Sequence, residues 1–208
     1  MKVLDVGCGT GSLCLALAPH FREVIGIDPD ERMLQLAIEK AGSEYGNVSF
    51  QPYGMLDLDK EDQFRQMDAV LCFGNTLVHL GSEEDILEFL RQAKATLKPG
   101  GKLMIQIINY DRIFNEKIDG LPTIENDSIK FVRNYHYTDR SALDFETILS
   151  IKESGEEIRN TISLFPILKD ELIRLVQKAG FHDILVYGNF KRDPYLPGSI
   201  PLLLQATS

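Results

Sequence analysis

A glycine-rich segment near the start of the chain has the residue types and spacing of a ligand-binding loop. Gly7, Gly9 and Gly11 alternate with Cys8 and Thr10, directly after a run of aliphatic residues. Glycine allows a sharp turn and lets a ligand approach the backbone closely. The free N–H groups of a helix that starts there favour negatively charged or polar groups. The segment therefore predicts a turn between a strand and a helix that can hold a small polar ligand.

Two acidic residues narrow the kind of ligand. Asp28 ends the next aliphatic run, and a carboxylate there can accept hydrogen bonds from both hydroxyls of a ribose, at about 1.5–3 kcal/mol each. Asp5 precedes the glycines, where an acid suits an ammonium group better than a phosphate. The spacing is GxGxG, because Ser12 stands where the dinucleotide fingerprint has its third glycine. These residues favour a nucleoside pocket over the two alternatives, a dinucleotide site and a turn without a ligand.

The elements around this loop predict an alternating α/β fold. Asp28 is placed to cap a helix with Pro29 in its first turn, and Ser82 to cap a later one. Strands and helices that alternate in this way form a parallel sheet with helices on both faces. Apolar runs of strand length occur at 2–6, 23–27, 48–50, 69–73 and 102–108.

The second half of the chain shows a different period. Within about 121–166, apolar and aromatic residues recur at every second position, which predicts an antiparallel insertion packed over one end of the sheet. A last helix over 170–179 ends at Gly180. The whole chain, 1–208, is predicted to be one domain. The alternating segments and the final strands are expected at 129–137, 143–153, 156–164, 184–187 and 202–206.

Composition and charge exclude several classes of function. The 208 residues carry a formal net charge of −9, which disfavours nucleic acid and anionic membranes as partners. Three cysteines lack paired CxxC spacing and the four histidines are scattered, so neither a disulfide framework nor a metal site is expected. No run is long enough to span a membrane, and the first residues lack a signal-peptide layout. We expect a cytoplasmic protein with a small-molecule partner, either monomeric or a homo-oligomer.

The segment VLDVGCGTGS (residues 3–12) resembles the cofactor motif of class I S-adenosylmethionine-dependent methyltransferases, an acid followed by GxGxG. The resemblance implies a three-layer Rossmann-like fold: a mostly parallel seven-stranded sheet with an antiparallel last strand, and an antiparallel insertion after the fifth strand. It implies S-adenosylmethionine as cofactor and S-adenosylhomocysteine as product. The residues implied to bind the cofactor are Asp5, Gly7, Cys8, Gly9, Thr10, Gly11, Asp28, Pro29, Met33, Gly54, Met55, Cys72 and Phe73.

The adenine end of the implied site departs from the family pattern. Gly54 stands where many members have an aspartate that binds adenine. The resemblance then leaves this contact to Tyr53, Met55 and backbone groups, with Met33 near the ribose.

Three further segments, FGNTLVHL (73–80), NYDRI (109–113) and NFKRDPY (189–195), resemble glycine N-methyltransferases and their relatives. Those enzymes carry an arginine that clamps the substrate carboxylate where this chain has Ile108. Glycine is therefore a poor candidate unless Arg133 reaches in from the insertion. The resemblance implies catalytic roles for Asn75, His79 and Tyr110, and substrate contacts for Asn75, Asn109, Tyr110, Arg133 and Tyr135.

The resemblance also carries two other expectations. Family members usually have helices before the first strand, whereas this chain starts directly at it, so either the pocket is unusually open or the start is shortened. Methyl transfer from a sulfonium depends mainly on proximity and alignment, and a neutral amine needs no strong base. The sequence therefore predicts methyl transfer to a small molecule, to nitrogen rather than oxygen. The alternatives are a non-catalytic cofactor-binding module and an RNA or protein methyltransferase.

Overall fold

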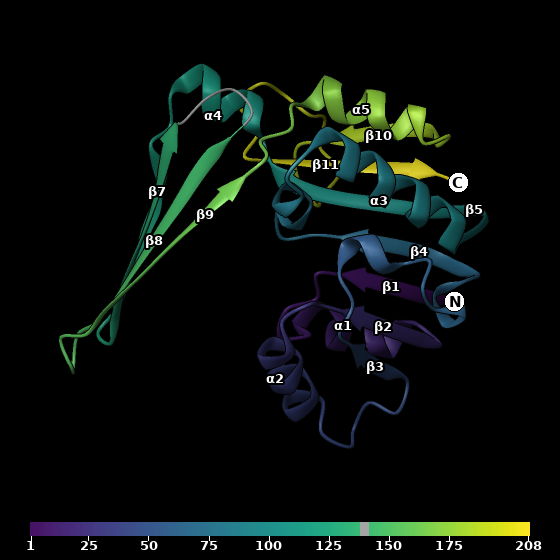
Figure 1. The fold of residues 1–208 in the computed structure, drawn as a ribbon, viewed down its shortest axis with the longest axis horizontal. Helices are drawn as coiled ribbons and strands as arrows, with labels where there is room; N and C mark the ends of the chain where they lie inside the picture. Colours follow the sequence, from purple (N-terminus) through teal and green to yellow (C-terminus); the bar gives the residue numbers. More distant parts are fainter. Residues whose placement is uncertain (138–141) are drawn as a thin grey trace.

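A seven-stranded sheet forms the centre of the fold (Figure 1). In a computed structural model, which describes residues 1–137 and 142–208, its order is β3-β2-β1-β4-β5-β11-β10. The strands from β3 to β5 pair in parallel, and β11 runs antiparallel to both of its neighbours. The predicted fold class is confirmed, with the last strand inserted between β5 and β10. The strands are β1 (Lys2–Val6), β2 (Glu23–Ile27), β3 (Val48–Gln51), β4 (Met67–Cys72), β5 (Leu97–Ile108), β10 (His182–Tyr187) and β11 (Pro201–Thr207).

Helices cover both faces of this sheet. Val3 and Val24 pack with Cys14 of the first helix on one face, while Leu4 and Ile25 join a larger cluster with the third and fifth helices on the other. Successive strand residues thus serve opposite layers, as expected for strands buried on both faces. No helix of the described residues is long and apolar enough to cross a membrane. The helices are α1 (Ser12–Leu17), α2 (Glu31–Ala41), α3 (Glu83–Thr96), α4 (Tyr110–Glu116) and α5 (Lys169–Lys178).

The start of α2 differs from the prediction. Asp30, not Asp28, caps this helix, because the Asp30 side chain accepts from the N–H groups of Arg32 and Met33. The predicted cap at Asp28 and the predicted place of Pro29 in the first turn are therefore wrong. The shift leaves the Asp28 carboxylate free to act at the end of β2. The predicted cap of α3 is confirmed, since Ser82 Oγ accepts from a backbone N–H three residues on.

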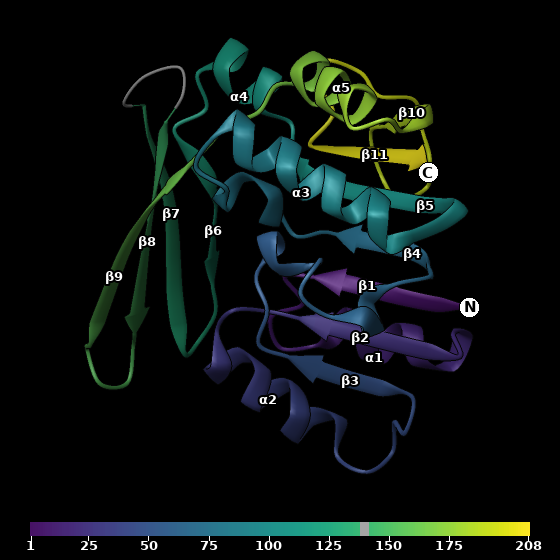
Figure 2. The same cartoon turned by 45° about the vertical axis from the view of Figure 1, so that its right-hand side comes forward.

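A second, four-stranded antiparallel sheet follows α4, in the order β6-β7-β8-β9. We call it the lid sheet. It stands beyond the carboxyl ends of the parallel strands, as Figures 1 and 2 both show. The predicted insertion is confirmed, but α4 and β6 were not predicted as separate elements. Pro122 cannot donate to the ladder, and the register of β6 shifts between Leu121 and Ile124. Its strands are β6 (Gly120–Glu125), β7 (Ile129–Tyr137), β8 (Leu143–Ile151) and β9 (Glu157–Leu164).

One face of the lid sheet contacts the body of the protein, and we call it the inner face. It carries Tyr135, Phe145 and Ile162 side by side across three strands. Tyr137, on the same face, donates through its hydroxyl to the carbonyl of Ile113 in α4 at 3.0 Å. These contacts attach one end of the lid sheet to the body of the protein.

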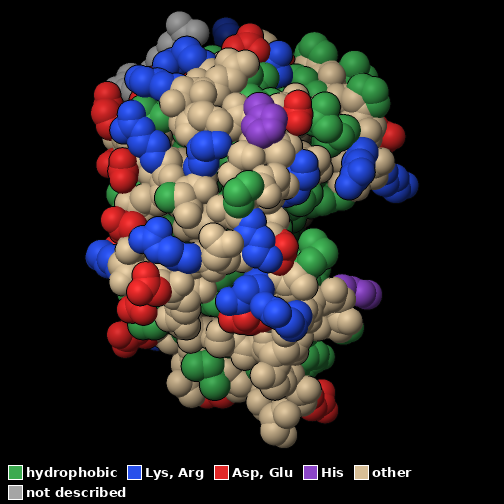
Figure 3. Space-filling model, turned by 90° about the vertical axis from the view of Figure 1, so that its right-hand side faces the viewer, with side chains coloured by type: hydrophobic (Ala, Val, Ile, Leu, Met, Phe, Trp, Pro, Cys, Tyr) green, Lys and Arg blue, Asp and Glu red, His purple; other side chains and the backbone are tan. Residues whose placement is uncertain are grey.

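Both chain ends lie on the opposite side of the main sheet from the lid sheet (Figure 1). The surface at that side carries both acidic and basic side chains (Figure 3).

Candidate functional site

One glycine of the loop between β1 and α1 faces open space. All three glycines have positive φ, which favours glycine over residues with a side chain. A Cβ atom at Gly7 would lie 2.3 Å from Thr76 Cγ2, and one at Gly11 would lie 2.6 Å from Phe50 Cζ. At Gly9 a Cβ atom would meet nothing within 4 Å. Gly7 and Gly11 therefore allow tight packing, while Gly9 leaves room for a ligand to reach the backbone.

Asp28 is held in a fixed position at the edge of this loop. Its Oδ2 accepts from the Gly9 N–H at 2.8 Å and its Oδ1 from the Asp30 N–H at 3.0 Å. A carboxylate has about four lone-pair directions, so these bonds leave two for a ligand. Asp28 lines a cleft of about 260 Å³. The other residues that line this cleft are Gly7, Pro29, Tyr53, Met55, Thr76 and His79.

Asp5 lies beneath the loop and not in the cleft. Its side chain is 3% exposed and accepts from the Cys14 thiol at 3.3 Å. Burial raises the pKa of this carboxyl to about 6. The expected contact with an ammonium group is not direct in this arrangement, and Asp5 supports the loop from below.

Several other residues predicted to bind the cofactor point elsewhere. The Cys72 side chain is fully buried, and the Phe73 ring packs edge-on against Phe190, with centroids 5.6 Å apart. Cys72 lines neither the cleft nor the separate small cavity that the Phe73 ring lines. The Thr10 hydroxyl is bonded by Lys40 Nζ at 2.9 Å.

Three other residues predicted to bind the cofactor, Cys8, Gly54 and Met33, lie in different surroundings. Cys8 Sγ points toward Gly26, because a Cβ atom there would lie 2.9 Å from it. The Gly54 N–H donates to Asp57 at 2.8 Å, which shapes the turn that leads to Met55. Met33, in the first turn of α2, is 40% exposed.

A tight turn after β4 places Asn75 next to the cleft. Gly74 and Asn75 both have positive φ, a conformation that asparagine tolerates better than most residues. Asn75 Nδ2 lies 2.9 Å from the Tyr110 hydroxyl, and its Oδ1 accepts from the Ile108 N–H at 3.0 Å. Tyr110 is 1% exposed, and burial raises the pKa of its hydroxyl well above the usual range. Asn75 and Tyr110 are therefore brought together, as predicted, with Tyr110 behind Asn75.

His79 lines the same cleft as Asp28. Partial desolvation lowers the pKa of the His79 imidazole, and the Asp28 carboxylate opposes that shift. The structure thus places His79 on the wall of this cleft, which Tyr110 does not line.

A larger cavity of about 880 Å³ lies between the lid sheet, α4 and the end of β5, and we call it the lid cavity. Ile108, Asp119, Arg133 and Tyr135 are among the residues that line it. Arg133 Nε and Tyr135 OH are buried without a hydrogen-bond partner, the two such side-chain atoms found among the described residues. An unpaired buried polar group costs about 1–3 kcal/mol, so such groups often mark a ligand site.

Comparison with known proteins agrees with this geometry. Residues 3–101 match the family described as "Methyltransferase domain". The glycine/sarcosine N-methyltransferase of Aphanothece halophytica is 30% identical over 192 residues, which cover 91% of this chain and 69% of that protein. The chain belongs to the class I S-adenosylmethionine-dependent methyltransferases.

Solved structures agree with this methyltransferase in fold. A methyltransferase from Clostridium acetobutylicum superposes with a TM-score of 0.86 at 14% identity, covering 99% of this chain and 83% of that one. The SAM-bound structure of CalS10, an amino pentose methyltransferase from Micromonospora echinaspora, gives 0.75 at 22% identity, covering 99% and 82%. At these identities the likeness concerns the fold alone.

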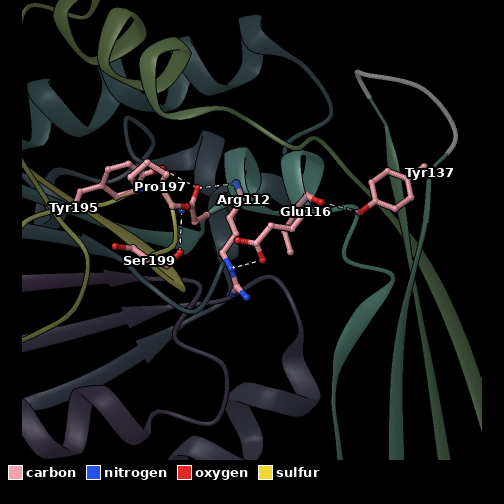
Figure 4. A network of polar contacts seen from close by, with 8 residues as sticks. Arg112, Glu116, Tyr137, Tyr195, Pro197 and Ser199 are labelled. Carbon is pink, nitrogen blue, oxygen red and sulfur yellow. Dashed lines mark hydrogen bonds and ion pairs between the residues drawn. The ribbon is translucent and has the colours of Figure 1, made fainter.

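Asn109 has a structural role in this methyltransferase that its sequence position did not reveal (Figure 4). Its Nδ2 donates to the carbonyls of Pro197 and Ser199, and its Oδ1 accepts from the Arg112 N–H and the Tyr195 hydroxyl. These four bonds use all of the hydrogen-bonding capacity of the side chain. Asn109 lines the lid cavity, but its side chain is fully bonded within the protein, so a substrate contact of this residue stays a prediction. The side chain joins the start of α4 to the segment before β11.

Thr76 and Asp119 are among the residues that line these spaces and were not predicted as site residues of the methyltransferase. Thr76 follows Asn75 and packs against Gly7, and Asp119 lies at the lid cavity. Thr76 could have been inferred from its place after the fourth strand. No sequence signal marked Asp119, because β6 was not predicted.

Proposed function

We propose that this methyltransferase moves the methyl group of S-adenosylmethionine to a nitrogen atom of a small molecule bound in the lid cavity. The observation that carries the proposal is that one turn, at Asn75 and Thr76, connects the walls of the two cavities. Thr76 lines the cleft beside Asp28, and the Asn75 amide binds Ile108, which lines the lid cavity. The cofactor and the acceptor would therefore approach each other across Asn75.

The residues of the cleft fit the cofactor. The open side of Gly9 suits a polar ligand close to the backbone, as the amino-acid end of S-adenosylmethionine requires. The free lone pairs of Asp28 suit the two ribose hydroxyls. Tyr53 and Met55 supply an apolar wall for the adenine, and His79 lies close enough to Asp28 to border the same ligand. When bound, the sulfonium supplies an activated methyl group.

The acceptor side supplies orientation more than acid–base chemistry. Asn75 holds one N–H of its amide to the Tyr110 hydroxyl, and its second N–H is available to an acceptor. Tyr135 offers an unpaired hydroxyl on the opposite wall. Burial raises the pKa of this hydroxyl to about 12, so it stays protonated at neutral pH. Such groups align a neutral amine for in-line attack, which is the main requirement of this reaction.

Nitrogen is favoured over oxygen because a hydroxyl acceptor would need a base next to it. The imidazole that could serve, His79, lies on the cofactor side. The N-methyltransferases among the relatives point in the same direction.

Calorimetry tests the cofactor half of the proposal. S-adenosylhomocysteine should bind with a one-to-one stoichiometry, and Asp28→Asn should weaken that binding. Absence of binding heat at millimolar ligand would refute the assignment. Methyl transfer to a panel of amines and matched alcohols, followed by mass spectrometry, then tests the acceptor atom, and transfer to alcohols alone would overturn the choice of nitrogen.

A further inference from the structure

The polar groups on the wall of the lid cavity are arranged as two separate sites. Tyr135 lies near the methyl-transfer end, because it packs in the same buried cluster as Tyr110, which contacts Asn75. Arg133 lies two residues earlier on the same strand and the same inner face. Side chains two residues apart on a strand are about 7 Å apart. An acceptor that reaches both must therefore extend along β7.

Arg133 is held in place but its charge is not neutralised. Its Nη2 donates to the Pro122 carbonyl at 2.6 Å, and its guanidinium lies over the Phe131 ring, 5.6 Å from the centroid. These contacts fix the plane of the group and leave the Nε–H without a partner. A preorganised guanidinium edge of this kind suits an oxyanion.

The other charged groups of the lid cavity do not compensate Arg133. Arg112 is paired with Glu116 at 3.0 Å. His136 contacts Glu146 at 3.2 Å on the outer side of β7. Among the cavity-lining cations that the structure describes, Arg133 is the one without a carboxylate partner.

A negative group lies toward the Tyr135 end. The Tyr135 N–H donates to the Asp119 carbonyl at 2.8 Å, so Asp119 sits beside Tyr135 on the neighbouring chain segment. Asp119 is an exposed residue and also lines the cavity. The cavity thus has an acidic residue beside Tyr135 and a guanidinium without a carboxylate partner at Arg133.

We infer that the acceptor is an amine with an anionic group four or five bonds from the nitrogen, the amine held near Tyr135 and Asp119 and the anion held by Arg133. This inference rests on the proposed function and names its substrate class. In glycine the nitrogen and carboxyl carbon are two bonds apart, which at roughly 1.5 Å a bond cannot exceed about 3 Å. Glycine cannot span the two sites. Ile108, an apolar residue at the end of β5, offers no nearer anchor for a carboxylate.

The test is a homologous series of acceptors of increasing length. Unbranched amino acids from glycine to 6-aminohexanoate are assayed with S-adenosylmethionine, with butylamine as a neutral amine and 2-aminoethyl phosphate as a phosphate ester. The value of kcat/KM should rise from glycine to a maximum at 4-aminobutanoate or 5-aminopentanoate and then fall. The two anion classes separate here, because a phosphate-specific site would favour 2-aminoethyl phosphate over 4-aminobutanoate of the same span.

Arg133→Gln should lower kcat/KM for the preferred anionic acceptor by about tenfold to hundredfold, the effect of losing a charge-assisted hydrogen bond. It should leave butylamine and S-adenosylhomocysteine binding unchanged. Arg159→Gln is the matched control, because Arg159 lies on the outer face of the same sheet and contacts Glu157 and Glu146. This control should behave as wild type.

The failure of this inference can be told apart from failure of the proposed function. If glycine is the best acceptor, if neutral and anionic amines react equally, or if Arg133→Gln matches Arg159→Gln, the inference is wrong while the methyltransferase activity stands. If no acceptor turns over, calorimetry with the S-adenosylhomocysteine-loaded protein decides. Binding of 4-aminobutanoate, 5-aminopentanoate or 2-aminoethyl phosphate that Arg133→Gln weakens supports the inference, and absence of such binding refutes it.

Discussion

The glycines of the loop should respond differently to the same substitution, and the structure sets the expected size of each effect. Gly9→Ala places a methyl group where nothing lies within 4 Å. Gly11→Ala places one 2.6 Å from Phe50 Cζ and 2.9 Å from Ala37 Cβ. Both positions have positive φ, at +52° and +72°. The backbone strain is therefore shared, and only Gly11 adds a steric clash.

The magnitudes follow from these two terms. A left-handed conformation costs an L-residue roughly 1–2 kcal/mol, so Gly9→Ala should lower the free energy of unfolding by about that amount. Overpacking a filled site costs typically about 1–3 kcal/mol more, so Gly11→Ala should lose roughly 2–5 kcal/mol. Cofactor affinity should follow the opposite order, because the new methyl group at Gly9 fills the space open to the ligand.

Urea unfolding measures the first quantity, and calorimetry with S-adenosylhomocysteine, corrected for the folded fraction, measures the second. Gly9→Ala should bind at least tenfold more weakly than wild type while it stays well folded. The reasoning fails if Gly9→Ala binds with wild-type affinity, or if it is as destabilised as Gly11→Ala.

Three further changes test other parts of the site. Asp28→Asn keeps one carbonyl oxygen but turns an NH2 group toward either the Gly9 or the Asp30 N–H. Cofactor affinity, measured by calorimetry, should therefore fall about tenfold to hundredfold. Unchanged affinity would show that Asp28 does not reach the ribose. The Asp5 carboxyl has a pKa of about 6 in the folded protein, compared with its ordinary value of 3.8 in the unfolded chain. Between these two pH values the folded protein keeps a proton that the unfolded chain has released, so the free energy of unfolding falls as pH rises. Relative to Asp5→Asn, wild type should lose on the order of 3 kcal/mol of unfolding free energy between pH 4 and pH 7 in urea titrations, and equal pH slopes would contradict this. Tyr137→Phe removes the hydrogen bond from the hydroxyl to the Ile113 carbonyl and should lower the free energy of unfolding by about 0.5–1.5 kcal/mol. It should also raise the KM of the acceptor more than the KM of the cofactor. A larger effect on the KM of the cofactor would show that Tyr137 does not support the lid cavity.

Much of the fold was predictable because its signals are local. The GxGxG spacing places a turn between strand and helix without reference to the rest of the chain. Strand-length apolar runs and two-residue alternation predicted the parallel sheet and the lid sheet, which the structure confirms. The elements that were not predicted, α4 and β6, are short, and Pro122 and a register shift interrupt the periodicity of β6.

The orientation of the site residues was less predictable. The Phe73 ring packs against Phe190 outside the cleft, and three of the four partners of the Asn109 side chain lie 86 to 90 positions away. His79 lines the cleft beside Asp28, whereas Asn75, in the same sequence segment, does not line it. A residue's place in a motif does not fix which neighbours its side chain meets.

The sequence by itself determined the loop, the acidic residue at the end of the second strand and the order of the elements, because backbone propensity and hydrophobic periodicity act over a few residues. Only the tertiary structure decided where the side chains of Arg133 and Tyr135 lie and which groups they contact. Their exposure depends on how β7 packs against α4 and the end of β5, segments joined by contacts between residues far apart in the chain. That packing buries two polar atoms without partners in a cavity, and a buried polar atom without a partner is a property that no single stretch of sequence contains.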